Sequence, residues 1–316
     1  MKKLLLVCLS VMIALVFAQT AFAAGSIKVM LLDGQSGGPY HDWKAISPVL
    51  KKQLEETGLF QVTVVTAPES EGDFSNFKPQ FGDYDVVVSN LDSPSWPADL
   101  KASFENYMKN GGGLVVVHGA DNAFPDWPAY NEMCGVGGWR NRTETAGPYW
   151  YYNNGKLVED KTPGNAGSHG ARWPFQVKAQ KPDHPILKGL PEVWMHYPDE
   201  LYDKMRGPGK NMTIIATAYS PAENKGTARD EPMLIVLNYG KGRIFHTIMG
   251  HNIPALACAG FITTFQRGTE WAATGKVTQQ SVPEDFPTAD SVSYRVPIAK
   301  MDPDFEYGAA GRPRGR

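Results

Sequence analysis

Residues 98–121, ADLKASFENYMKNGGGLVVVHGAD, decide the fold class of this chain. The segment 98–109 predicts a helix, which the glycines at 111–113 end. Residues 114–117 form a short, continuous apolar run, typical of a strand that is buried on both faces of a sheet. The strand leads directly into His118. The stretch therefore predicts a helix and then a buried strand with a polar residue at its carboxyl end.

The same alternation extends toward the N-terminus. The predicted elements are strands at 27–32, 61–66 and 84–89 and a helix from residue 43 to about residue 56. Short apolar strands alternating with helices predict an α/β fold, with a doubly wound parallel sheet covered by helices on both faces. Ligands of such sheets bind beyond the carboxyl ends of the strands. We therefore expect the loops after Leu32, Ser89 and Val117 to line the site.

Regular pattern is lost between residues 121 and 170, a stretch rich in Trp, Tyr, Gly, Asn and Pro. A loop this long in a compact domain is usually functional. Further elements are predicted beyond it: strands at 175–178, 213–217, 233–237 and 243–248 and a helix at 254–273. From residue 277 the chain is polar and contains prolines. The predicted organisation is a leader at 1–23, an α/β domain at 24–276 and an extended C-terminal tail at 277–316.

The N-terminus has the pattern of a secretory signal peptide. Lys2 and Lys3 precede an apolar run at 4–18, and Ala21, Phe22 and Ala23 match an A-x-A cleavage site. The run is shorter than the roughly 20 residues that a membrane span needs, which favours a signal peptide over the alternative of a membrane anchor. We expect cleavage after Ala23, a periplasmic or secreted protein, and no membrane span in the mature chain.

The composition is that of an ordinary globular protein. Hydrophobic residues make up 42% of the chain and charged residues 20%, which excludes wholesale disorder and collagen-like structure. The 31 Lys and Arg nearly balance the 33 Asp and Glu, so no nucleic-acid partner is expected. The cysteines left after cleavage, Cys134 and Cys258, either pair in an oxidising compartment or are buried free thiols. The oligomeric state is left open.

Five motifs occur in a fixed order: GGGLVVVHGAD at 111–121, HPILKGLP at 184–191, DELY at 199–202, GRIFHTIMGHN at 242–252 and FQRGTEWAATG at 265–275. Together they resemble the ThuA-like (trehalose utilisation) family, over about residues 27–275. The resemblance implies a fold like that of the class I glutamine amidotransferases, with a flavodoxin-like, mostly parallel sheet. It also implies a role in carbohydrate catabolism, notably of disaccharides handled as keto-sugars.

The chain departs from the amidotransferases at the position of their nucleophile. Those enzymes carry a Cys on a tight turn between a strand and a helix, whereas the equivalent turn at 117–121 reads VHGAD. Cys134 and Cys258 lie elsewhere in the sequence, so no thiol stands at that turn. We therefore do not expect glutamine amidotransferase activity.

His118 and Asp121 lie at the carboxyl end of the predicted strand at 114–117. An imidazole titrates near neutral pH and suits proton transfer. A carboxylate three residues further on either orients that imidazole or caps the next helix. The alternative to a catalytic role is a hydrogen-bonded core histidine followed by a helix cap.

Three further polar residues lie in loops at the same predicted edge. His41 follows a glycine-rich loop, Glu200 belongs to the DELY motif, and His251 follows the last strand. His251 is favoured over His246 as a site residue, because it lies in the loop at the end of the strand. Strand alternation places His246 on one face of the strand, where it can be buried. The predicted catalytic residues are His118, Asp121, His41, Glu200 and His251.

The aromatic-rich stretch suits sugar binding. Flat rings match the apolar C–H face of a pyranose, while Asn, Arg and Glu side chains hydrogen-bond its hydroxyls. The alternative is that most of these rings pack the loop onto the domain. The predicted binding residues for a small-molecule carbohydrate are Trp139, Arg140, Arg142, Tyr149, Trp150 and Tyr202.

No metal or other cofactor is expected, because the chain has neither an HExxH motif nor a paired-cysteine spacing. The alternative is a metal site made by His118, His251 and a carboxylate. The favoured function is acid–base chemistry on a sugar or keto-sugar, as an isomerase, lyase or hydrolase. The alternative function is a non-catalytic periplasmic sugar-binding module, because a fold does not determine a function.

Overall fold

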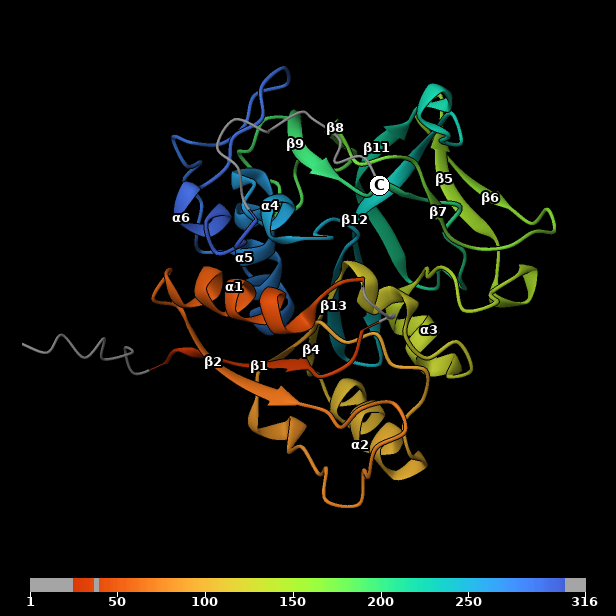
Figure 1. The fold of residues 1–316 in the computed structure, drawn as a ribbon, viewed down its shortest axis with the longest axis vertical. Coiled ribbons are helices and arrows are strands. Elements are labelled where there is room, and N and C mark those ends of the chain that lie inside the picture. The colour runs from red at the N-terminus through yellow and green to blue at the C-terminus, as the bar shows by residue number, and fades with distance from the viewer. Residues whose placement is uncertain (1–24, 37–39, 305–316) are drawn as a thin grey trace, which may run out of the picture.

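A computed structural model of the protein describes residues 25–36 and 40–304. Figure 1 shows an α/β fold around one large central sheet. The predicted signal peptide at 1–23 lies outside the described residues. No helix in the described ranges is both long enough and apolar enough to cross a membrane.

The central sheet is mixed, with strand order β2-β1-β3-β4-β13-β12-β11-β8-β9. Its first five strands run parallel, and antiparallel strands continue it from β12 onward. The strands are β1 Ile27–Asp33, β2 Phe60–Thr66, β3 Val86–Ser89, β4 Gly113–Val117, β8 Trp173–Ala179, β9 Val193–Asp199, β11 Met212–Ser220, β12 Arg229–Tyr239 and β13 Gly242–Thr247. The predicted α/β class and the parallel strands are confirmed.

Helices cover both faces of the parallel strands. In Figure 1, α1 and α5 lie on one side and α2 lies on the other. The helices are α1 Trp43–Glu55, α2 Ala98–Lys109, α3 Pro128–Cys134, α4 Ile253–Leu256, α5 Ala259–Thr274 and α6 Val296–Ala299. The last helix was predicted as one element, but it is two. The break falls at Cys258, whose backbone forms a β-bridge with Tyr294 of the C-terminal segment.

The aromatic-rich stretch is more regular than the sequence indicates. It contains α3 and an antiparallel hairpin of β5 (Tyr149–Asn153) and β6 (Lys156–Asp160). The hairpin joins the central sheet where Tyr152 pairs with Asp230 of β12. The short strands β7 (Ser168–His169) and β10 (Tyr202–Asp203) pair with each other beside it. The expectation of an irregular loop is therefore wrong, because pairing over long sequence distances supplies the order.

The segment after α5 packs back onto the domain as far as it is described. Phe286 is buried against Trp194, and Ile298 of α6 is buried near α4. Cys134 and Cys258 are both buried free thiols, so of the two alternatives for these cysteines the unpaired one is found.

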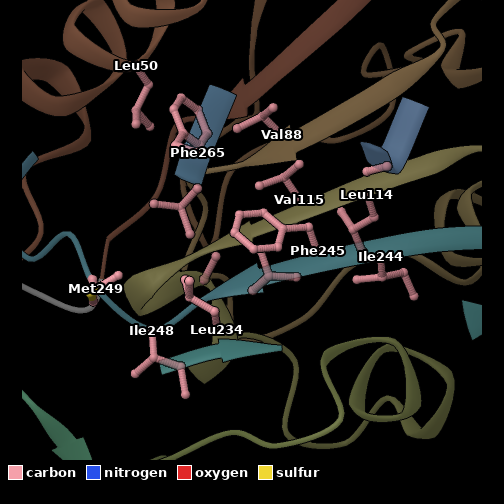
Figure 2. Packing of buried hydrophobic residues seen from close by; sticks show 14 of the residues in the cluster. Leu50, Val88, Leu114, Val115, Leu234, Ile244, Phe245, Ile248, Met249 and Phe265 are labelled. Atoms are coloured by element: carbon pink, nitrogen blue, oxygen red, sulfur yellow. The ribbon is translucent and has the colours of Figure 1, made fainter. Parts of the chain in front are cut away.

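Part of the core lies between the parallel strands and α5, as Figure 2 shows for Phe245, Phe265 and Val115. Phe245 of β13 is fully buried. Helix α5 approaches this strand closely because residue 268 is glycine: a Cβ there would lie 2.1 Å from the Phe245 ring. This close approach holds the helix against the strand that leads to the His251 turn.

Removing the ring of Phe245 tests this packing. Phe245→Ala should lower the free energy of unfolding by about 3–5 kcal/mol, because a large cavity opens in a rigid core. Chemical denaturation measures the change. Leu157→Ala is the control, because Leu157 is 45% exposed on the outer hairpin and should change stability by less than about 1 kcal/mol. Equal effects of the two substitutions would contradict this view of the core.

Glu231 of β12 gives the protein a pH-dependent stability. Burial raises the pKa of its carboxyl from 4.5 to about 7, although a hydrogen bond from Thr227 opposes the shift. The folded chain therefore holds this proton more tightly than the unfolded chain. It follows that the free energy of unfolding falls as the pH rises from about 4.5 to about 7.

Glu231→Gln should remove this loss, because a neutral amide needs no deprotonation. The variant should exceed the wild type in unfolding free energy by about 2–3 kcal/mol at pH 8, and the difference should shrink toward pH 4.5. Denaturation curves across that range measure it. A constant difference at every pH would show that Glu231 does not titrate as described.

Candidate functional site

A pocket of about 620 Å³ opens at the carboxyl end of the parallel strands. The loops after β1, β3 and β4, which were predicted to line the site, contribute Ser36, Asp92 and Asn122 to this pocket. The complete lining is Ser36, Tyr40, His41, Ser70, Asp92, Pro94, Asn122, Trp139, Arg140, His169, Glu200 and Tyr202. Residues far apart in sequence therefore meet over one edge of the sheet.

Four of the five predicted catalytic residues gather at the base of this pocket. One side-chain nitrogen or oxygen from each of His41, His118, Glu200 and His251 lies within 4.8 Å of the others. We call these residues the four-residue cluster. They come from the loop after β1 and from the ends of β4, β9 and β13. These nitrogen and oxygen atoms are suited either to proton transfer or to binding a metal ion.

His118 lies beneath the pocket and does not line it. Only 2% of the residue is exposed, and its ring centre lies 4.1 Å from that of Tyr202. Nδ1 lies 2.6 Å from the carbonyl oxygen of Ile248. Burial lowers the pKa of His118, so its imidazole is neutral. Within the cluster, His41 and Glu200 are the residues that can contact a molecule bound in the pocket.

His41 connects the cluster with the pocket. Its Nε2 lies 3.0 Å from the Tyr202 hydroxyl, and burial with the nearby His118 and His251 lowers its pKa to about 2. A Cβ on Gly119 would lie 2.5 Å from Nδ1 of His41, so glycine is required at that position for this approach. His41 and His118 also share positive φ angles, 56° and 43°. Strained backbone of this kind is concentrated at functional sites.

Glu200 supplies the negative charge of the cluster. Its Oε2 lies 3.1 Å from Nδ1 of His251 and 3.7 Å from Nε2 of His169. Burial alone would raise the pKa of Glu200, but the surrounding imidazoles, His251 first among them, lower it to about 2. The carboxylate is therefore ionised, and it lines the pocket as a proton acceptor.

Asp199 holds the two loops that carry Glu200 and His251. Its carboxylate is buried and accepts hydrogen bonds from the backbone amides of Glu200 at 2.8 Å, Gly250 at 2.7 Å and His251 at 3.1 Å. It also contacts Nε2 of His196 at 2.9 Å. One buried carboxylate thus fixes the end of β9 against the turn after β13.

The partner of Asp199 is a charged imidazole. Burial would lower the pKa of His196, but the neighbouring Cys258 and Asp199 raise it to about 9. Burial would likewise raise the pKa of Asp199, but His196 holds it well below its usual range. At neutral pH the two therefore form a fully buried ion pair.

Asp121 differs from its predicted role. It was expected to orient His118 or to cap a helix, but its carboxylate lies 3.2 Å from Nε2 of His246. Nδ1 of His246 in turn lies 3.0 Å from the carbonyl oxygen of Cys134. The orienting partner of His118 is the Ile248 carbonyl. Asp121 and His246 are both buried and tie β4 to β13 behind the cluster.

Three of the six predicted binding residues line the pocket: Trp139, Arg140 and Tyr202. Arg140 donates from Nε to Asp92 at 2.8 Å, and this ion pair forms part of the wall. Trp139, Arg140 and Asn141 all have positive φ, between 46° and 59°. This tight left-handed turn directs residues 139–141 of the aromatic-rich stretch toward the pocket.

The other three predicted binding residues have structural contacts. Arg142 is 5% exposed and donates to the carbonyl oxygens of Asn122, Gly138 and Ala123. The Tyr149 hydroxyl and the Trp150 indole also donate to backbone carbonyls. None of the three lines the pocket. Their polar groups stabilise the aromatic-rich stretch itself. This agrees with the alternative that most of its rings pack the stretch onto the domain.

Sequence reasoning gave no role to Asp92, Asp199 and His169. Asp92 lies in the loop after β3, which was predicted to line the site. His169 follows the aromatic-rich stretch and approaches Glu200 through the β7–β10 pair. Asp199 precedes Glu200 in the DELY motif, but its role depends on a contact with residues about 50 positions away.

Comparison with known proteins assigns the family. A family model described as ThuA, trehalose utilisation, matches residues 28–272. The chain belongs to the ThuA family. The resemblance seen in the sequence motifs is thereby confirmed.

Solved structures agree with this assignment. A ThuA-like protein from Parabacteroides merdae ATCC 43184 is 46% identical to this ThuA-family chain, with a TM-score of 0.82 over 85% of this chain and 98% of that one. A ThuA-like protein from Bacteroides uniformis ATCC 8492 is 19% identical, with a TM-score of 0.54 over 81% and 95% of the two chains, and supports the fold alone. A search of curated proteins found no match.

Asp199→Asn tests the buried anchor of this ThuA-family site. The variant should lower the free energy of unfolding by roughly 3–5 kcal/mol, because His196 is left as an unpaired buried charge. Urea denaturation at pH 7 measures the loss. Asp99→Asn is the control, because Asp99 forms an exposed ion pair with Lys78 and should leave the denaturation midpoint unchanged. A wild-type midpoint for Asp199→Asn would refute the anchoring role.

Proposed function

We propose that this ThuA-family protein is exported, binds a sugar or keto-sugar in the pocket, and acts on it by acid–base chemistry. The observation that carries the proposal is the ionised carboxylate of Glu200 in the lining of a pocket that has an aromatic wall. The family description, trehalose utilisation, supports a carbohydrate as the substrate class. The signal-peptide pattern at 1–23 supports export to the periplasm or the medium.

The position of the pocket agrees with a flavodoxin-like winding of the parallel strands, which is part of this proposal. The order β2-β1-β3-β4-β13 corresponds to the doubly wound order 2-1-3-4-5. The direction of winding then reverses between β1 and β3. Ligands of such sheets bind at this reversal, and the loops after both strands line the pocket.

The pocket walls suit a sugar. Trp139 offers an apolar ring face, which matches the C–H face of a pyranose. Arg140, Asp92 and Asn122 offer donors and acceptors for hydroxyl groups. A volume of about 620 Å³ lies within the usual range for small-molecule sites.

Glu200 is the group best placed to take a proton from a bound sugar. It is ionised, lines the pocket and is held by Asp199 through its own backbone amide. His169, 3.7 Å away, also lines the pocket and is the nearest imidazole there to return a proton. Isomerisation, elimination and hydrolysis each use such a pair.

The test is binding and turnover of a panel of disaccharides, trehalose included, and their keto forms. Glu200→Gln should lower turnover by at least about 100-fold while binding changes little, because the amide keeps the shape of the carboxylate and removes its basicity. Calorimetry measures binding, and NMR of the sugar measures turnover. If wild-type protein binds a sugar but converts none, the protein is a sugar-binding module and the catalytic part of the proposal is wrong.

Trp139→Ala should weaken sugar binding by about tenfold, because the ring face is lost. Trp173→Ala is the matched control: its side chain is 55% exposed and lies outside the pocket lining. Calorimetry with the same sugar measures both variants. Equal losses in the two variants would place the sugar elsewhere.

A further inference from the structure

The cluster contains three buried imidazole nitrogens that have no hydrogen-bond partner: Nδ1 of His41, Nε2 of His118 and Nδ1 of His251. Buried polar atoms are nearly always paired, so three together form an exception that needs an explanation. One ring nitrogen from each of the three histidines and one carboxylate oxygen of Glu200 lie within 4.8 Å of one another. The three histidines and Glu200 therefore surround a common centre.

The tautomer of His118 is fixed by its surroundings. The carbonyl oxygen of Ile248, 2.6 Å from Nδ1, can only accept, so Nδ1 carries the proton. Nε2 of the neutral ring then presents its lone pair to the cluster. Metal-binding histidines characteristically donate their other N–H to a carbonyl in this way.

His41 has a matching arrangement. Its Nε2 lies 3.0 Å from the Tyr202 hydroxyl, whose oxygen can accept a hydrogen bond from an N–H at that nitrogen. Nδ1 is then free to point at the centre of the cluster. Gly119 leaves the room for it, because a Cβ there would lie 2.5 Å from Nδ1.

Glu200 and His251 complete the set from the other side. Their side chains meet at 3.1 Å, yet Nδ1 of His251 is not in hydrogen-bonding geometry. Both backbones are fixed by the same Asp199 carboxylate. Glu200 and His251, two candidate metal ligands from different loops, are therefore held in place independently of any hydrogen bond between their side chains.

We propose that His41, His118, His251 and Glu200 bind one divalent transition-metal ion. Three imidazoles and one carboxylate suit zinc and its neighbours, whereas calcium and magnesium take oxygen ligands. Ligands about 2.1 Å from one ion lie at most about 4.2 Å apart, so the widest pair, at 4.8 Å, has to close by about 0.6 Å. Small side-chain rotations supply this change. The proposal replaces the sequence-based expectation of no metal.

The site deepens the proposed function and rests on it only for the nature of the substrate. His41 and Glu200 belong both to the cluster and to the pocket lining, so an ion between them faces the pocket. Such an ion polarises a sugar oxygen or lowers the pKa of a bound water. Glu200 would then hold the ion at the pocket while the ion supplies Lewis acidity there.

Calorimetry on the full chain, stripped with a chelator and free of sugar, tests the site with ZnCl₂ alone. One ion should bind per chain, and His118→Ala should weaken binding by at least about 100-fold. His184→Ala is the matched control and should bind zinc as the wild type does, because His184 lies outside the cluster against Trp271. The proposal is overturned if the wild type binds no zinc, or if His118→Ala binds it as tightly as the wild type.

Two further variants keep the test decisive if His118→Ala fails to fold. His251→Ala removes a ligand whose side chain is only partly buried, and it should abolish the visible absorption of cobalt bound to the site. Gly119→Ala keeps all four ligands but displaces His41, and should weaken zinc binding by about tenfold. Unchanged cobalt spectra and zinc affinity in both folded variants would overturn the proposal.

The metal site and the proposed function fail in different ways. If zinc binds in the cluster and no sugar of the panel binds, the proposed function is wrong and the metal site stands. If the wild type binds no zinc and yet converts a sugar of the panel, the metal site is wrong and the proposed function stands.

Discussion

The site depends on the buried carboxylate of Asp199. It accepts hydrogen bonds from backbone amides of two loops that are about 50 residues apart in sequence. Its negative charge is paired with the charged imidazole of His196. A buried charge is costly unless it is fully paired, so this group forces both loops into one geometry. This constraint places Oε2 of Glu200 3.1 Å from Nδ1 of His251. The chemistry of the pocket therefore rests on a residue that does not line it.

The frame around this anchor explains why strained backbone is tolerated. His41 and His118 hold positive φ angles at the ends of loops that are tied to strands of the central sheet. Parallel strands packed against α5, with Phe245 fully buried, are rigid enough to carry that strain. Gly119 then allows the two imidazoles to approach each other. Core packing and site geometry are thus parts of one arrangement.

Much of the frame is predictable because it is encoded locally. The run at 114–117 predicts its strand and places His118 at the strand's end, since buried strands need only a short apolar stretch. Asp121 was paired with the wrong histidine, because closeness in sequence does not decide which side chain faces it. The β5–β6 hairpin was missed, because its residues read as an aromatic loop until β12 supplies a partner. The roles of Asp199 and Gly119 likewise depend on contacts between distant segments.

The pocket is assembled from two parts of the chain. The cluster at its base comes from strand ends of the central sheet, whereas Trp139 and Arg140 in its wall come from the insertion. Evolution can therefore exchange the wall, and with it the shape of the molecule that is admitted, while the reactive groups stay in place. Substrate preference can therefore differ between relatives without a change in the reacting groups.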